Sequence, residues 1–152
     1  MIKSLRISNF RNYQDQALIF SKPKVVFVGD NGQGKTNLLE AIYFLSFLRS
    51  FRTTGVRSLK RMDSPGFSLE AVIDSGMGFD GSLQVDYAER RRLLIDDQPV
   101  HKSSEFVRRV KAVAFTHDDL YLVLGGAQGR RRFLDMLCST VNATYMSVLQ
   151  DY

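Results

Sequence analysis

Residues 25–39 read Val-Val-Phe-Val-Gly-Asp-Asn-Gly-Gln-Gly-Lys-Thr-Asn-Leu-Leu, and no other part of the chain has chemistry that is as easy to assign. The apolar run Val25–Val28 is typical of a buried strand, and an apolar helix is expected to begin at Thr36. The segment between them, Gly29–Thr36, matches the pattern G-x-x-x-x-G-K-[ST]. A strand, a glycine loop and a helix in this order predict a phosphate-binding loop (P-loop), and the spacing disfavours the dinucleotide pattern G-x-G-x-x-G.

The loop residues suit phosphate binding for physical reasons. Glycines let successive amide N–H groups turn toward an anion, and the following helix directs the positive end of its dipole at the same point. Lys35 is expected to contact the β- and γ-phosphates of ATP, which makes it the catalytic candidate, and the Thr36 hydroxyl is expected to bind Mg²⁺. The residues predicted to bind the nucleotide are Gly29, Asp30, Asn31, Gly32, Gln33, Gly34, Lys35, Thr36 and Asn37.

Composition limits the class of protein. A length of 152 residues, with 24% charged and 44% hydrophobic residues, suits one soluble globular domain or a fragment of a larger one. The net charge of +5 favours a polyanionic partner, although nucleotide binding alone would accommodate a mild positive excess. With a single cysteine, no signal pattern and no apolar run of membrane length, the sequence favours a cytoplasmic protein that does not bind membranes.

Beyond the loop, the pattern predicts an α/β fold with a mixed sheet around the P-loop helix and a small antiparallel β layer. The helix over 37–48 is apolar except for Glu40, so it should be buried on several sides. Strands are expected at 2–10, 17–20, 68–74, 82–87, 92–96 and 112–115. Turns are expected at 12–16 and 97–99, and glycines 76, 78 and 81 predict a hairpin. Further helices are expected at 103–109, 117–125 and 130–152. The last has no glycine or proline exit, which predicts that residues 1–152 are a truncated domain.

Hydrolysis of a nucleoside triphosphate normally needs an acid that follows an apolar strand. Asp96 and Asp97 follow such a strand, but Gln98-Pro99 come next, so a hairpin turn is the favoured interpretation. Asp63–Gly66 imitates the D-x-x-G of GTPases, but no apolar strand precedes it and no N-K-x-D segment exists in the chain. We therefore expect the catalytic acid to lie outside these 152 residues.

Several segments together resemble the N-terminal part of the RecF family of bacterial DNA replication and repair ATPases, which is related to SMC and ABC-type heads. They occur in the same order over nearly the whole chain. The matching segments are Phe10–Tyr13, Gly29–Ile42, Ser50–Thr53, Phe115, Asp119–Leu120, Gly125–Gly126 and Arg131–Asp135.

The resemblance implies that residues 1–152 form lobe I of a two-lobed P-loop head of the ABC type, and that a second lobe carries the signature motif and the Walker B acids. In such heads two ATP molecules lie between two protomers, which implies a homodimer on ATP binding. By similarity, Arg11 approaches the nucleotide; the alternative is an exposed arginine at a strand end. Asp118 or Asp119 stands where related ATPases carry a glutamine, so helix capping is the safer role for these acids.

The leading hypothesis is therefore the ATP-binding part of a RecF-type protein that binds DNA at single-strand/duplex junctions and cooperates with other recombination mediators of the RecF pathway. The fragment alone should bind ATP without hydrolysing it efficiently. A stand-alone P-loop phosphotransferase and a non-enzymatic nucleic-acid-binding module are the alternatives. The basic segment 49–61 and the run Arg130–Arg132 have two interpretations each: contact with nucleic-acid phosphates, or a structural, solvated or ion-paired role.

Overall fold

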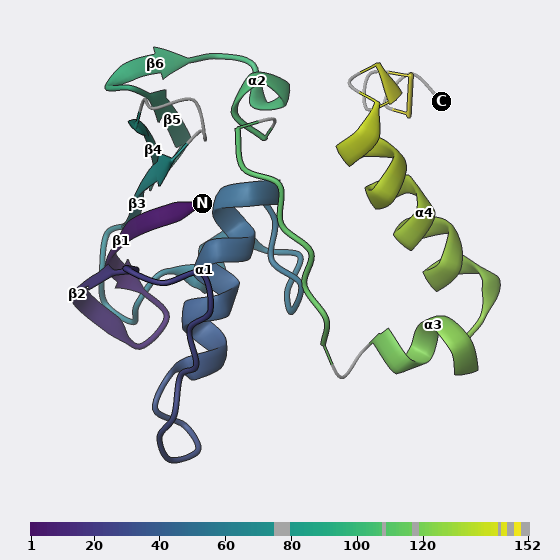
Figure 1. The fold of residues 1–152 in the computed structure, drawn as a ribbon, viewed down its shortest axis with the longest axis horizontal. Coiled ribbons are helices and arrows are strands. Elements are labelled where there is room, and N and C mark those ends of the chain that lie inside the picture. The colour runs from purple at the N-terminus through teal and green to yellow at the C-terminus, as the bar shows by residue number, and fades with distance from the viewer. Residues whose placement is uncertain (75–79, 108, 117–118, 143, 146–147, 150–152) are drawn as a thin grey trace. The chain divides into compact units, whose positions relative to one another are not determined.

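The chain is described by a computed structural model that covers residues 1–74, 80–107, 109–116, 119–142, 144–145 and 148–149 (Figure 1). It divides into two compact units, Met1–Val110 and Lys111–Tyr152. The phosphate-loop sequence belongs to the first unit, which is built around one sheet.

The first unit is a six-stranded sheet in the order β2-β1-β3-β4-β5-β6, in which every neighbouring pair is antiparallel. Its strands are β1 (Ile2–Phe10), β2 (Tyr13–Ile19), β3 (Phe67–Asp74), β4 (Asp80–Tyr87), β5 (Arg91–Ile95) and β6 (Gln98–Val100). Its helices are α1 (Lys35–Phe47), the 3₁₀ helix η1 (Val56–Leu59) and α2 (Ser103–Val107). The α/β character expected from the sequence is present, with the antiparallel layer as the main sheet.

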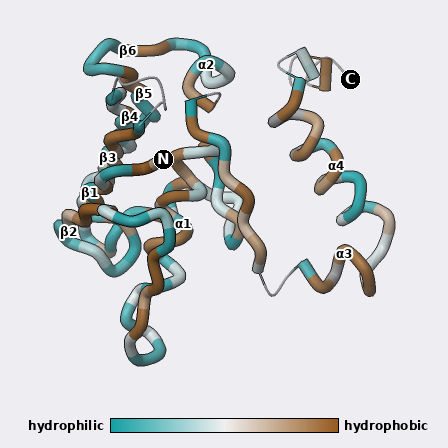
Figure 2. The backbone as a smooth tube through the Cα atoms, viewed as in Figure 1, coloured by the Kyte–Doolittle hydropathy of each residue, from teal (hydrophilic) through white to brown (hydrophobic). Residues whose placement is uncertain are grey.

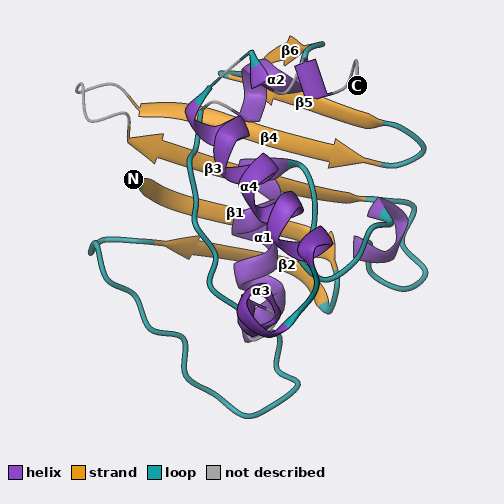
Figure 3. Ribbon diagram, turned by 90° about the vertical axis from the view of Figure 1, so that its right-hand side faces the viewer, coloured by secondary structure: helices purple, strands orange, loops and turns teal. Residues whose placement is uncertain are grey.

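The core forms where the strands alternate apolar and polar residues. Leu5 and Ile7 of β1 point to the buried face, and the register places Ala71 and Leu69 of β3 directly beside them. Helix α1 covers this face, as Figure 3 shows, and its apolar residues appear brown in Figure 2. Phe67 contacts the ring of Phe44 with centroids 5.7 Å apart, so aromatic packing joins the helix to the sheet.

Two strand predictions are wrong for this chain. Residues 25–28 form no strand, and Val26 and Val28 are 83% and 90% exposed. Residues 112–115 form none either, and Phe115 is 89% exposed. A strand needs a neighbour for its backbone groups, and neither segment belongs to a strand of the described sheet. The apolar residues of these two segments were therefore not sufficient for strand formation.

Turn positions also moved from their predicted places. The expected turn at 12–16 is shorter, because Phe10 already pairs with Tyr13 and β2 begins at that residue. The hairpin after β5 is confirmed, but its turn residues are Asp96 and Asp97, both with positive φ, while Gln98 and Pro99 belong to β6. Aspartate tolerates this left-handed conformation better than most residues do. Glycines 76 and 78 lie outside the described residues.

The second unit contains α3 (Leu120–Leu124) and α4 (Ala127–Val141). Helix α4 ends at Val141, so the predicted continuous helix over 130–152 is too long: the chain leaves the helical conformation at Asn142, whose N–H still bonds to the Cys138 carbonyl. Residues 117 and 118, predicted to begin a helix, lie outside the described part. Asp119 accepts hydrogen bonds from the backbone N–H and the hydroxyl of Thr116, a capping arrangement at the start of α3.

Candidate nucleotide-binding site

The glycine loop leads directly into the N-terminus of α1. Gly34 precedes the first helical residue, Lys35, and has a φ of 103°. Gly32 has a φ of 83°, also in the left-handed region that side chains other than glycine rarely adopt. The first amide groups of a helix have no partner within it, so the N-terminus of α1 offers donors and the positive dipole end at the loop.

Lys35 lies folded over the loop that precedes it. Its Nζ donates to the carbonyl oxygens of Gly29 and Asp30, each at 2.6 Å. These acceptors are neutral, whereas an anionic oxygen would add the attraction between opposite charges to the hydrogen bond. An anion in the loop would therefore compete well for the Lys35 ammonium group.

Thr36 is exposed in the first turn of α1. Its hydroxyl is an oxygen ligand of the kind that Mg²⁺ accepts, and Mg²⁺ is usually bound by few protein groups together with substrate phosphates and water. Within the described residues no group of three or more His, Cys, Asp or Glu side chains could hold a metal ion. The Thr36 hydroxyl, as one oxygen ligand beside a phosphate loop, fits a Mg²⁺ ion that is shared with a nucleotide.

The turn between β1 and β2 contacts the phosphate loop. The Asn12 side-chain amide donates to the Gln33 carbonyl, and the Tyr13 hydroxyl donates to the Gly34 carbonyl, both at 3.2 Å. Burial raises the pKa of the Tyr13 hydroxyl, which favours the protonated form that donates this hydrogen bond. Asn37 of α1 in turn donates to Asn12 Oδ1 at 2.9 Å.

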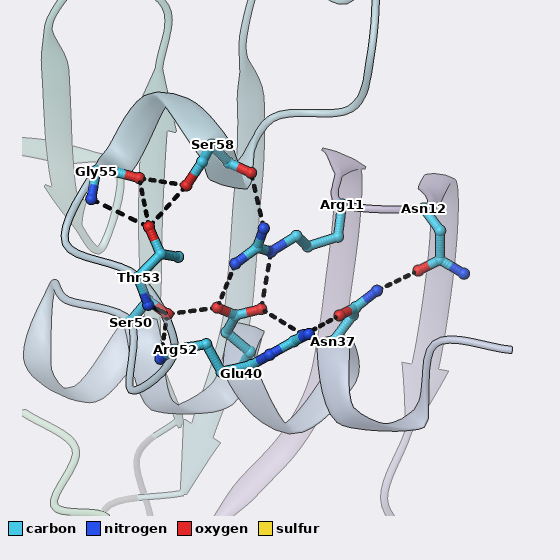
Figure 4. A network of polar contacts seen from close by, with 9 residues as sticks. All are labelled: Arg11, Asn12, Asn37, Glu40, Ser50, Arg52, Thr53, Gly55 and Ser58. Atoms are coloured by element: carbon cyan, nitrogen blue, oxygen red, sulfur yellow. Dashed lines mark hydrogen bonds and ion pairs between the residues drawn. The ribbon is translucent and has the colours of Figure 1, made fainter. Parts of the chain in front are cut away.

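Glu40 of α1 is the centre of a polar network (Figure 4). Its carboxylate is fully buried and accepts two hydrogen bonds from Arg11, from Nε at 2.9 Å and from Nη2 at 2.8 Å. Ser50 donates a further hydrogen bond, and Arg52 lies 3.6 Å away. Arg52 also donates to Asn37 at 2.8 Å. The network thus connects β1, α1 and the segment that follows α1.

Sequence reasoning noted Glu40 but assigned it no partner. The signal was a lone carboxylate in a helix that is otherwise apolar, because a buried charge requires a partner. Arg11, a predicted nucleotide-binding residue, bonds through all three side-chain nitrogens to Glu40 and to the Ser58 carbonyl. Its role at the nucleotide stays a prediction.

The acids considered as catalytic candidates lie in turns. Asp96 Oδ1 accepts a hydrogen bond of 2.8 Å from the backbone N–H of Ser82, which connects the β5–β6 turn to β4. Asp63 has a φ of 61° and stands in the turn before β3. Both acids therefore lie in turns, and the location of the catalytic acid outside this chain stays a prediction.

The basic segments are partly used inside the fold. Within 49–61, Arg52 bonds to Glu40 and Asn37, and Lys60 donates to the Ser64 carbonyl at 2.8 Å. Arg57 is exposed. At the start of α4, Arg130 donates to the Gly125 carbonyl at 2.8 Å.

A glycine loop at the N-terminus of a buried helix, with a lysine and a threonine in its first turn, defines a P-loop nucleotide-binding domain. Residues 1–103 match the family model described as AAA ATPase domain, and the chain belongs to this family.

Relatives and solved structures narrow this class. A DNA replication and repair protein RecF of Synechococcus sp. (strain JA-2-3B'a(2-13)) is 36% identical over 152 residues, which are 99% of this chain and 40% of that protein. The ATP-bound structure of the recombination mediator protein RecF superposes on this chain with a TM-score of 0.92 and 28% sequence identity. The matched region is all of this chain and 42% of the RecF chain. An SMC ATPase with a TM-score of 0.71 and 18% identity shares the fold.

The resemblance to RecF and the ABC-type P-loop fold predicted from the sequence are therefore confirmed. The chain spans about two fifths of the length of the curated relatives it matches. Within the described residues, no helix is both long enough and apolar enough to cross a membrane.

Proposed function

We propose that residues 1–152 are the ATP-binding lobe I of a RecF-type DNA replication and repair protein. The observation that carries the proposal is the complete loop Gly29–Thr36 at the N-terminus of α1, with Lys35 positioned over it. The bound nucleotide would contact the residues predicted above, from Gly29 to Asn37, together with Arg11. The similarity to a RecF–ATP structure over the whole chain supports this assignment.

Lys35 would contact the β- and γ-phosphates, and the Thr36 hydroxyl would hold Mg²⁺, which offsets phosphate charge. Because Asp63 and the pair Asp96–Asp97 lie in turns, we infer that the acid for hydrolysis belongs to the part of the relatives that this chain does not match. ATP would then close two protomers on DNA, and hydrolysis by the complete protein would release it. The DNA would contain single-strand/duplex junctions, and further partners would be other recombination mediators. A cytoplasmic location is part of the same proposal.

Nucleotide titration tests the site. Lys35→Ala removes the only side-chain cation of the loop, so we expect ATP affinity to fall about 10- to 100-fold, the range for a lost hydrogen bond to a charged group. Lys22→Ala, at an exposed position before the loop, is the matched control and should leave affinity unchanged. Equal affinity of the Lys35→Ala chain and the parent chain for ATP, measured by calorimetry, would refute the proposed site.

Salt dependence tests the DNA part. If about three phosphates are neutralised, duplex affinity should fall about 40-fold between 50 and 200 mM salt. Arg57→Ala should lower the log–log slope by about 1 if this exposed side chain contacts a phosphate. Arg6→Ala is the control: it removes the same charge, but the Arg6 side chain already donates two hydrogen bonds to Asp15. It should therefore leave the salt slope of DNA affinity nearly unchanged. A flat salt response would remove DNA phosphate binding from the proposal.

A further inference from the structure

Asn12 in the β1–β2 turn and Tyr13 at the start of β2 hold two successive carbonyl groups of the phosphate loop. Asn12 Nδ2 donates to the Gln33 oxygen, and Tyr13 Oη donates to the Gly34 oxygen. These contacts join segments 21 residues apart. They come from side chains outside the loop motif, so the motif by itself does not determine the orientation of these two peptide groups.

A trans peptide group points its carbonyl and the N–H of the next residue in opposite directions. No peptide bond of the described structure is cis. When Asn12 holds the Gln33 carbonyl, the N–H of Gly34 therefore points away from Asn12. In the next peptide group, Tyr13 holds the Gly34 carbonyl, so the N–H of Lys35 points away from Tyr13. Inward-directed N–H groups are what a phosphate loop needs to bind its anion.

We propose that Asn12 is a positioning residue for phosphate binding: by holding the Gln33 carbonyl it keeps the Gly34 amide directed at the phosphates of the nucleotide. The inference rests on the proposed nucleotide site and adds a residue outside the loop. Asn12 acts through the loop backbone and needs no contact with the nucleotide itself.

The Asn12 side chain is held in the required orientation by its neighbours. Its Oδ1 accepts from Asn37, whose own Oδ1 accepts from Arg52 at 2.8 Å, and Arg52 lies beside the buried Glu40. Figure 4 shows the contact between Asn37 and the Asn12 oxygen. Because Asn37 donates to this oxygen, the nitrogen of the Asn12 amide is left to face the Gln33 carbonyl.

Gly34 allows this close approach. A Cβ atom at Gly34 would come within 2.7 Å of the Asn12 side-chain amide atoms. The glycine therefore serves two purposes: it adopts the positive φ at the helix start, and it leaves room for Asn12 against the loop.

Asn12 and Tyr13 should not contribute equally. The Gly34 carbonyl also accepts the backbone N–H of Leu38 at 2.9 Å, so it keeps a partner when the Tyr13 hydroxyl is removed. Asn12 provides the hydrogen bond to the Gln33 carbonyl from outside the loop. We expect Asn12→Ala to weaken binding more than Tyr13→Phe.

The test is calorimetric titration of the whole chain with ADP and with ATP. Asn12→Ala should weaken both nucleotides about three- to tenfold, as for one lost hydrogen bond, and Tyr13→Phe less than about threefold. Gln16→Ala, an exposed amide on β2 whose side chain donates to the Ala17 carbonyl, is the matched control and should bind as the parent chain does. Hydrogen exchange of residues 29–36 without nucleotide should accelerate in Asn12→Ala, while exchange in β1 and β2 keeps the rate of the parent chain.

Three outcomes would overturn the inference. Parent-like nucleotide affinity and loop exchange in Asn12→Ala would refute it while leaving the Lys35 result intact. A melting temperature that falls in proportion to the affinity, with faster exchange throughout β1 and β2, would show a structural role in place of a positioning role. Failure of the parent chain to bind any nucleotide would remove the proposed function and this inference together.

Discussion

Replacing Glu40 by alanine is expected to destabilise the chain by about 3 kcal/mol, at the lower end of the cost of removing one partner from a buried ion pair. The carboxylate is fully buried, and the Arg11 side chain is 20% exposed. After the substitution, Arg11 would keep its bond to the Ser58 carbonyl but lose its counter-charge. A loss of this size is a large part of the total stability of an ordinary domain.

Urea unfolding followed by circular dichroism measures this effect, since the chain has no tryptophan. Glu40→Gln keeps the shape and removes the charge, so it should cost less, about 1–2 kcal/mol. Glu89→Ala removes an exposed carboxylate in the β4–β5 turn and is the control, expected to change stability by under about 0.5 kcal/mol. If Glu40→Ala and Glu89→Ala unfold at the same urea concentration, the network does not stabilise the fold.

Replacing Gly66 by alanine is the second large expected effect, about 3 kcal/mol of destabilisation, as for a severe overpacked site. A Cβ atom at this position would lie 1.9 Å from the Tyr87 carbonyl oxygen and 2.9 Å from Ala88 Cα. These are backbone atoms of the β4 end, where Phe67 and Tyr87 pair and their rings stack at 5.5 Å. Relief of the clash would therefore separate β3 from β4 beside the core.

Gly55→Ala is the matched control for this substitution. No atom lies within 4 Å of the corresponding Cβ position, and the φ of Gly55 is −92°, which alanine adopts readily. It should be neutral or stabilise the chain by under about 1 kcal/mol, because alanine reduces the entropy of the unfolded chain. Equal urea midpoints for the two variants would contradict the crowding at Gly66.

Much of the site was predictable from local sequence. The loop pattern identified Gly29–Thr36, and the apolar run behind it predicted the buried helix α1. Strands β3 and β4 followed from alternating apolar and polar residues, because one covered face of an antiparallel sheet enforces that alternation. Strands β1 and β5 followed from their apolar residues without a strict alternation. Asp96-Asp97 was correctly interpreted as part of a hairpin and not as a catalytic strand end.

Other features could not be predicted because their partners are distant in sequence. Glu40 meets Arg11 across 29 residues, and Asn12 meets Gln33 across 21. Neither pair has a spacing rule of the kind that makes i and i+4 neighbours on a helix. Residues 25–28 failed as a strand for a related reason, since strand formation depends on a neighbouring chain segment as well as on apolar content.

The sequence by itself determined the phosphate loop, the class of P-loop ATPase and the positions of most strands, since each depends on residue type at short spacing. Only the tertiary structure decided which side chains hold the loop: Asn12 and Tyr13 donate to its carbonyls, and the buried Glu40 is connected to Asn12 through Arg52 and Asn37. These contacts arise because packing α1 on the sheet brings the β1–β2 turn to the helix N-terminus, and a carboxylate buried by that packing requires a charged partner.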